Sequence, residues 1–269
     1  MSEEKPRPTE ARNPRASNLE SFTTREILEL MNDEDSTVPA VVSRAVPAIA
    51  RATDAIVAAF ERGGRLRYVG AGTSGRLGVL DASEAPPTFG VEPEMVRGII
   101  AGGDEALRRS IEGAEDDALA GAREVREIVR GSDVLVGISA SGRARFVIAA
   151  LVMAREIGAF TVALTVDPTS PLAQGADEVI VIDVGPEILA GSSRLKAGTA
   201  TKLVLNMLST AAMIRSGRTR GDLMIDLKAT NAKLRERATR MVMQVAGVTE
   251  DEARERLEAN GWSVRNAIG

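Results

Sequence analysis

Residues 66–90, LRYVGAGTSGRLGVLDASEAPPTFG, contain the pattern that predicts the fold. The apolar run 66–69 predicts a buried strand, and the Gly/Ser/Thr loop 70–75 leads into an amphipathic helical pattern from Arg76. Such a junction suits an anion, because glycines let the backbone approach it and the helix N-terminus adds N–H groups and partial positive charge. The loop is not a Walker A motif, since no lysine follows its last glycine, and it fits GxGxxG only in part.

A second loop repeats this pattern. VGxxxSGR occurs at residues 69–76 and again at 136–143, each time where a predicted strand ends and a helix begins. Any strand-to-helix turn favours Gly and Ser, so one such loop alone is also explained as a simple turn. The shared pattern favours one phosphate site built from both loops. Its candidate ligands are the backbone N–H groups of Gly72 and Gly75 and the hydroxyl groups of Thr73, Ser74, Ser139 and Ser141.

A third serine-rich stretch, GSSRLKAGT at 191–199, precedes a long helical pattern at 194–215. Ser192 or Ser193 is a suitable N-cap for this helix, and that is one interpretation. Arg194 and Lys196 oppose the helix macrodipole, which favours negative charge at this end. A bound anion would offset the mismatch, so the other interpretation is that Ser192, Ser193 and Lys196 line the substrate site.

Strands and helices alternate along the chain. The predicted strands are 66–69, 95–100, 134–138, 160–166 and 178–184, and the main predicted helices are 24–31, 38–62, 76–83, 104–112, 117–130, 143–157 and 194–215. We expect Pro86 and Pro87 to end the third helix, which leaves Glu84 at its end or in the turn after it. This alternation predicts an α/β three-layer sandwich with a mainly parallel five-stranded sheet, and ligands at the carboxyl ends of its strands.

The amino-acid composition limits the catalytic groups and the binding partners that the protein can have. The 269 residues carry 34 Lys and Arg against 38 Asp and Glu, a net charge of −4 without the basic bias of nucleic-acid binders. Cysteine and histidine are absent, so any general acid or base must be Asp, Glu, Lys or Tyr. The first 17 residues lack the apolar core of a signal peptide, and the apolar run 146–154 is too short to cross a bilayer. We therefore expect a soluble, cytoplasmic protein that binds neither nucleic acid nor membrane.

Several long segments resemble one known family. GAGTSGRLGVLDASEAPPTFG, AGGDEALRRSIEGAEDD, GISASGR and GSSRLKAGTATKLVLNMLST closely resemble the N-acetylmuramic acid 6-phosphate etherases, which have a sugar isomerase (SIS) domain. Ala85 stands where family members often carry Cys. The resemblance implies three parts: a flexible N-terminal arm at 1–21, the SIS domain at 22–225, and a helical region at 226–269. The last part resembles a ubiquitin-associated bundle and stops short of the length it has in relatives.

The family cleaves the ether between C3 of the sugar and D-lactate, as part of peptidoglycan amino-sugar recycling, and uses no metal and no organic cofactor. If the sugar opens to its aldehyde, a base can remove the C2 proton, lactate leaves from C3 with proton assistance, and water then adds. By resemblance the two acidic residues are Glu84 and Glu115. We assign Glu84 as the proton donor to the lactyl oxygen and Glu115 as the base at C2. Without the resemblance, Glu84 is equally explained as a solvated carboxylate at a helix end, and Glu115 is better explained as one more acid in a solvated Glu-Asp-Asp run.

The pattern at 194–215 is apolar nearly all round, which predicts burial in the core or in a subunit interface. The resemblance implies a homodimer, in which Glu115 would reach the partner's substrate. Two alternatives remain. One is a binding-only sensor like the glucokinase regulatory protein, which also has SIS domains, and the other is an aldose–ketose isomerase of the wider SIS class. Both glutamates in their family contexts, together with the 191–199 segment, favour the etherase.

Overall fold

The computed structural model describes residues 7–227, 229 and 231–269. At its centre lies a five-stranded sheet with the order β2-β1-β3-β4-β5, and every neighbouring pair is parallel. The strands are β1 (Leu66–Gly70), β2 (Val96–Ile100), β3 (Val134–Ile138), β4 (Phe160–Thr165) and β5 (Glu178–Val181). The chain runs from β1 outward to β2 and then returns to the other side of β1 with β3. The strand order therefore changes direction between β1 and β3.

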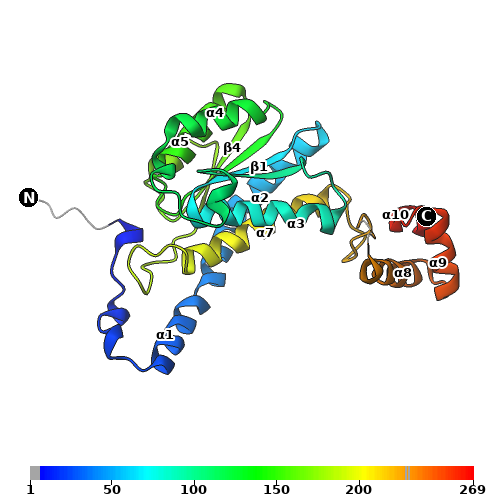
Figure 1. The fold of residues 1–269 in the computed structure, drawn as a ribbon, viewed down its shortest axis with the longest axis horizontal. Helices are drawn as coiled ribbons and strands as arrows, with labels where there is room; N and C mark the ends of the chain where they lie inside the picture. The colour runs from blue at the N-terminus through cyan, green and yellow to red at the C-terminus, as the bar shows by residue number, and fades with distance from the viewer. Residues whose placement is uncertain (1–6, 228, 230) are drawn as a thin grey trace, which may run out of the picture.

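Helices cover both faces of the sheet, so the predicted three-layer α/β architecture is confirmed (Figure 1). One face carries α2 (Val38–Glu61), α3 (Gly72–Phe89) and α7 (Lys196–Arg215), and the other carries α4 (Ala118–Ile128) and α5 (Arg145–Ile157). Alternate strand residues enter the two cores: Tyr68 packs in the α2/α3/α7 core and its neighbour Val69 in the α4/α5 core. Burial on both faces explains why the strands read as apolar runs.

The remaining helices lie outside this sandwich. α1 (Thr24–Ser36) starts with a capping box between Thr23 and Glu26, and α6 (Pro171–Gln174) is a single turn. α8 (Ala232–Ala246), α9 (Glu250–Ala259) and α10 (Val264–Ile268) lie to one side of the sheet around a small core of their own (Figure 1). Ile225 and Leu227, on either side of the expected boundary at 225/226, pack into this third core. None of the helices in the described ranges combines the length and the apolar character that a membrane span needs.

The predicted end of one helix and the prediction of another helix are wrong. α3 does not end before Pro86 but runs through both prolines to Phe89, and Gly90 ends it with φ +65° and an N–H···O bond of 2.9 Å to Pro86. Prolines in the last turn remove few hydrogen bonds, and the glycine supplies the left-handed residue that ends a helix. The predicted helix 104–112 is only a 3₁₀ turn, Asp104–Leu107, because it buries just Ala106 and short helices need packing to persist.

Residues 7–21, expected as a flexible arm, form three 3₁₀ turns in the structure: Pro8–Glu10, Pro14–Ala16 and Leu19–Ser21. The backbone N–H of Gly191 donates to the Thr9 carbonyl over 2.9 Å. Asn13 is only 8% exposed, and its side-chain amide donates to the Pro186 carbonyl over 3.4 Å. The segment thus packs against the loop that precedes α7. Residues 1–6 lie outside the described residues.

Candidate active site

A cavity of about 250 Å³ opens where β1 and β3 end, at the point where the strand order changes direction. Open parallel sheets bind ligands at this position, because the loops after the two strands diverge there. Five chain segments line the cavity. They contribute Thr9 and Glu10, then Ala71–Ser74 and Glu115, then Ile138–Ser141 and Ala144, and finally Gly191 and Ser193.

The first wall is the N-terminus of α3. Gly72, Thr73 and Ser74 form its first turn, and Gly75 is the first residue whose N–H reaches back within the turn, to Ala71 over 3.3 Å. The N–H groups of a helix's first turn have no partner inside the helix and point at an incoming ligand. Gly75 itself is buried outside the lining, and a Cβ there would lie 2.7 Å from the Gly70 carbonyl oxygen. Gly75 therefore allows α3 to pack closely on β1.

The second wall is the turn after β3. Ser139 is 6% exposed and Ser141 is partly buried, and both line the cavity. The Gly142 N–H donates to the Ser139 carbonyl over 2.9 Å, and Gly142 has φ +63°. α5 begins only at Arg145, whereas α3 begins two residues after β1 ends. The two VGxxxSGR segments thus meet at one cavity but adopt different conformations.

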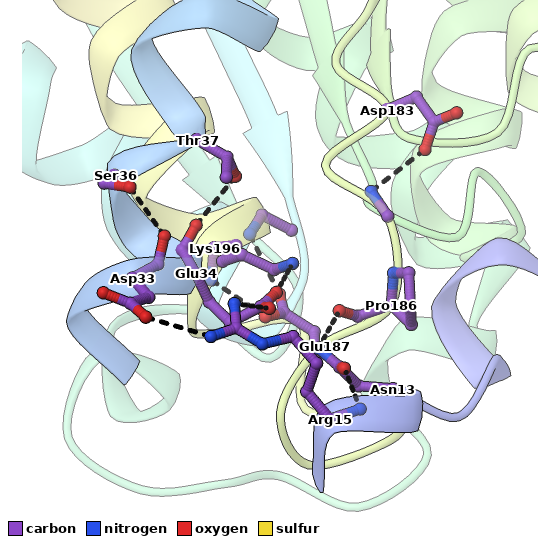
Figure 2. A network of polar contacts seen from close by, with 12 residues as sticks. Asn13, Arg15, Asp33, Glu34, Ser36, Thr37, Asp183, Pro186, Glu187 and Lys196 are labelled. Atoms are coloured by element: carbon purple, nitrogen blue, oxygen red, sulfur yellow. Dashed lines mark hydrogen bonds and ion pairs between the residues drawn. The ribbon is translucent and has the colours of Figure 1, made fainter. Parts of the chain in front are cut away.

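The third wall brings Gly191 and Ser193 to the cavity, while Ser192 and Lys196 lie outside its lining. The expected serine cap of α7 is wrong, because no side chain of the N-cap region bonds to the helix and the Glu187 carboxylate takes that place. It accepts the backbone N–H groups of Lys196 and Ala197 over 3.0 and 2.9 Å (Figure 2). Burial raises the pKa of the Glu187 carboxyl, although these two N–H groups oppose the shift.

The Lys196 ammonium group is also engaged within the chain. Its Nζ lies 2.6 Å from Glu34 Oε2, and both side chains are largely buried (Figure 2). Burial alone would raise the pKa of Glu34, but Lys196, Asn13 and Arg15 hold it below its usual value. Lys196 was predicted to bind substrate, and the structure instead shows it in an ion pair that joins α7 to α1.

The two predicted glutamates are in different places. Glu115 is exposed and lines the cavity from the 3₁₀ turn Ala114–Asp116, directly between it and a neighbouring cavity of about 210 Å³ that includes Arg76 and Arg109. Glu84 is exposed on α3, about 18 Å along the helix axis from Gly72. A single chain thus brings Glu115 together with the Ser/Gly loops, but not Glu84.

Thr9 and Glu10 line the cavity from a segment that was not predicted to reach the site. They lie about 60 positions before the first loop, in a polar segment without an apolar period. Only the fold, through the Thr9–Gly191 hydrogen bond, brings them to the site.

The fold and the cavity define an SIS-domain protein. The SIS domain family model matches residues 117–211, and the model for the glucokinase regulatory protein N-terminal SIS domain matches residues 48–155. Among solved structures, the phosphoheptose isomerase from Neisseria gonorrhoeae aligns with a TM-score of 0.54 over 71% of this chain and 98% of its own. Its 21% identity makes this a likeness of fold.

Sequence relatives are much more similar. The chain is 54% identical over 261 residues to an N-acetylmuramic acid 6-phosphate etherase of Jannaschia sp. (strain CCS1), covering 97% of this chain and 83% of the relative. It is 55% identical to one of Histophilus somni (strain 129Pt), covering 97% of this chain and 86% of that relative. The chain belongs to the N-acetylmuramic acid 6-phosphate etherase family.

Proposed function

We propose that the protein cleaves the D-lactyl ether of N-acetylmuramic acid 6-phosphate and yields N-acetylglucosamine 6-phosphate and D-lactate. The observation that supports this most directly is that Glu115, Ser74 and Ser139 line one cavity at the sheet's switch point. A phosphate-binding loop pair and a carboxylate base within one cavity suit proton removal from a phosphorylated sugar. The names of the relatives supply the particular sugar and the ether.

The phosphate group of the substrate would bind between the first turn of α3 and the turn after β3. The donors there are backbone N–H groups and the hydroxyls of Thr73, Ser74, Ser139 and Ser141. The described lining contains no Lys or Arg. The phosphate dianion is therefore bound by neutral donors and by the helix N-terminus, which stabilise its negative charge without a cationic side chain.

The reaction needs one base and one acid. In the open-chain sugar the aldehyde makes the C2–H acidic, and Glu115 removes this proton. The electron pair forms the C2–C3 double bond as the C3–O bond breaks, and Glu84 donates a proton to the leaving lactyl oxygen. Water then adds to C3 and a proton returns to C2, which leaves the alcohol. One carboxyl group accepts a proton and the other donates one, so the first must start ionised and the second protonated.

Glu84 can serve this cavity if it comes from a second copy of the chain. Within one protomer it lies about 18 Å from Gly72 along α3, farther than a monosaccharide phosphate reaches. Leu80, one helical turn before Glu84 on the same face, is 52% exposed, and Met207 and Ile214 of the adjacent α7 are 39% and 49% exposed. Exposed apolar side chains on two adjacent helices suit a subunit contact. We therefore propose a homodimer in which Glu115 acts within its own protomer and Glu84 reaches the partner's cavity.

The test is D-lactate release from N-acetylmuramic acid 6-phosphate, followed with a coupled lactate dehydrogenase. We expect Glu84→Gln and Glu115→Gln each to abolish release while the sugar phosphate still binds. Co-expressed in equal amounts, the two variants should recover about a quarter of wild-type activity. Half of the dimers are then mixed, and one of their two cavities holds both native glutamates. No recovery would contradict the shared site but not the reaction.

A second candidate is a sensor that binds sugar phosphates without turnover, which the match to the glucokinase regulatory protein model favours. Ligand-induced stabilisation without any lactate release would support it. An aldose–ketose isomerase would instead convert a 6-phosphate aldose without touching C3. For the etherase we propose a cytoplasmic location, because a phosphorylated sugar is charged and does not cross a membrane unaided.

A further inference from the structure

The N-terminal segment places a second carboxylate at the cavity. Glu10 lies at the end of the turn Pro8–Glu10 and is a lining residue together with Thr9. Its side chain is exposed, and it forms no hydrogen bond or ion pair with other described residues of the chain. Glu10 and Glu115 are the only charged side chains in the described lining. The proposed reaction uses Glu115 and leaves Glu10 without a role.

One hydrogen bond and one close approach place Glu10 beside the loop that carries Gly191. The Gly191 N–H donates to the carbonyl of Thr9, the residue before it, over 2.9 Å. Gly191 has φ +80°, and a Cβ there would lie 3.4 Å from Glu10 Oε2. The carboxylate therefore lies next to the third wall of the cavity, beside a residue that lacks a side chain.

A polar network anchors the segment just beyond Glu10 (Figure 2). Asn13 accepts the Arg15 N–H over 2.9 Å and donates to Pro186. The Arg15 guanidinium lies 2.9 Å from Asp33 and 3.2 Å from Glu34 on α1. Glu34 in turn holds Lys196 at the start of α7. The segment that carries Glu10 is thus tied to two helices of the SIS domain.

The negative charge of Glu10 indicates which part of a sugar phosphate it can contact. An ionised carboxylate only accepts hydrogen bonds, and it repels a phosphate dianion. The phosphate donors belong to other walls, at 72–74 and 139–141. What remains for Glu10 in a sugar-phosphate site is a donor of the sugar itself, a hydroxyl or the amide N–H.

We infer that the N-terminal segment is part of the substrate site and that Glu10 determines sugar specificity by accepting hydrogen bonds from hydroxyl or amide groups of the bound sugar. This inference rests on the proposed function for the class of ligand. A charge-assisted hydrogen bond of this kind changes affinity by about ten- to a hundredfold. The segment acts as a wall of the cavity. Its loss therefore weakens binding of the sugar and leaves the phosphate subsite intact.

The experiment compares two probes by calorimetric titration: N-acetylglucosamine 6-phosphate, and inorganic phosphate alone. Glu10→Gln should lower the affinity for the sugar phosphate about ten- to a hundredfold and leave the affinity for inorganic phosphate unchanged. Glu20→Gln, the same change on an exposed glutamate of the same segment outside the cavity lining, should alter neither. Arg15→Ala, which releases the anchor to α1, should reproduce the loss for the sugar phosphate only.

With substrate, Glu10→Gln should raise KM far more than it lowers kcat, because Glu10 binds the sugar and takes no part in proton transfer. Equal affinity of Glu10→Gln and wild type for the sugar phosphate would overturn the inference while the proposed function stands. Equal loss for both probes would also overturn it, since Glu10 would then act on the phosphate end or on folding. A wild type that binds phosphate but not the sugar phosphate would instead refute the proposed function.

Discussion

Gly142 offers the sharpest test of how the second loop is built. Its φ of +63° is a left-handed conformation that costs a residue with a Cβ about 1–2 kcal/mol. A Cβ at this position would also overlap Oγ and Cβ of Ser170 and lie 3.0 Å from Thr165 Oγ1. Ser170 is fully buried and caps α6 through the Ala173 N–H, so it has no room to move.

Gly142→Ala therefore combines two costs. Backbone strain contributes about 1–2 kcal/mol and overpacking against Ser170 about 1–3 kcal/mol, so the free energy of unfolding should fall by about 2–5 kcal/mol. Gly185→Ala is the matched control, because Gly185 has φ +66° and no atom within 4 Å of its Cβ position. It should lose only the strain contribution, about 1–2 kcal/mol.

Urea unfolding followed by far-ultraviolet circular dichroism measures both losses at unchanged m-value. The double variant Gly142→Ala/Ser170→Gly removes the overlapping atoms and should recover about 1–3 kcal/mol relative to the sum of the single changes. Equal losses for the two alanine variants, or no coupling in the double variant, would refute the packing argument. Gly142→Ala should also lower the affinity for inorganic phosphate, because the Gly142 N–H donates to the Ser139 carbonyl and so positions the Ser139 turn.

Three further predictions concern the helices and the ion pair that joins α7 to α1. Gly121→Ala should lower the free energy of unfolding by about 1–3 kcal/mol, because its Cβ would overlap the Phe146 carbonyl oxygen where α4 meets α5. Gly198→Ala in α7, with its nearest contact at 3.6 Å, should instead gain up to about 1 kcal/mol in helix propensity; a matching loss would contradict the argument. The ion pair of Glu34 contributes stability above its usual pKa of 4.5, and this is lost as pH falls through the lowered pKa. Lys196→Met should therefore cost about 1–3 kcal/mol at pH 7 and less in acid, and a cost in urea unfolding that is the same at both pH values would contradict this.

The sheet was predictable because its strands are mostly apolar and are bounded by polar or glycine residues. The structure places β3 at Val134–Ile138, the range predicted from sequence, since all five of its residues are buried between the two helical layers. The meeting of the 70–75 and 139–142 loops followed from parallel topology alone. Both loops follow strands that are neighbours in the sheet, and the carboxyl ends of parallel strands share one edge.

The parts that could not be predicted depend on contacts distant in sequence. Thr9 reaches the cavity through Gly191, and no local pattern marks a pairing across so many residues. The exposed position of Glu84 had a similar cause: α3 passes through Pro86 and Pro87, so Glu84 lies on a helix face rather than in a turn. Local rules disfavour this continuation, and packing of Ala82, Ala85 and Phe89 into the core overrides them.

The start of α7 shows how a correct physical requirement can be met by an unexpected group. Lys196 at a helix N-terminus predicted an anion there, and the anion is the chain's own Glu187 carboxylate. Because Glu187 occupies the first N–H groups of α7, this helix has fewer free donors for a substrate phosphate. Among the helices that begin near the cavity, α3 has a first turn, Gly72, Thr73 and Ser74, whose residues all line it. We therefore expect the phosphate of the proposed substrate at α3, with the sugar extending toward Glu10 and Glu115.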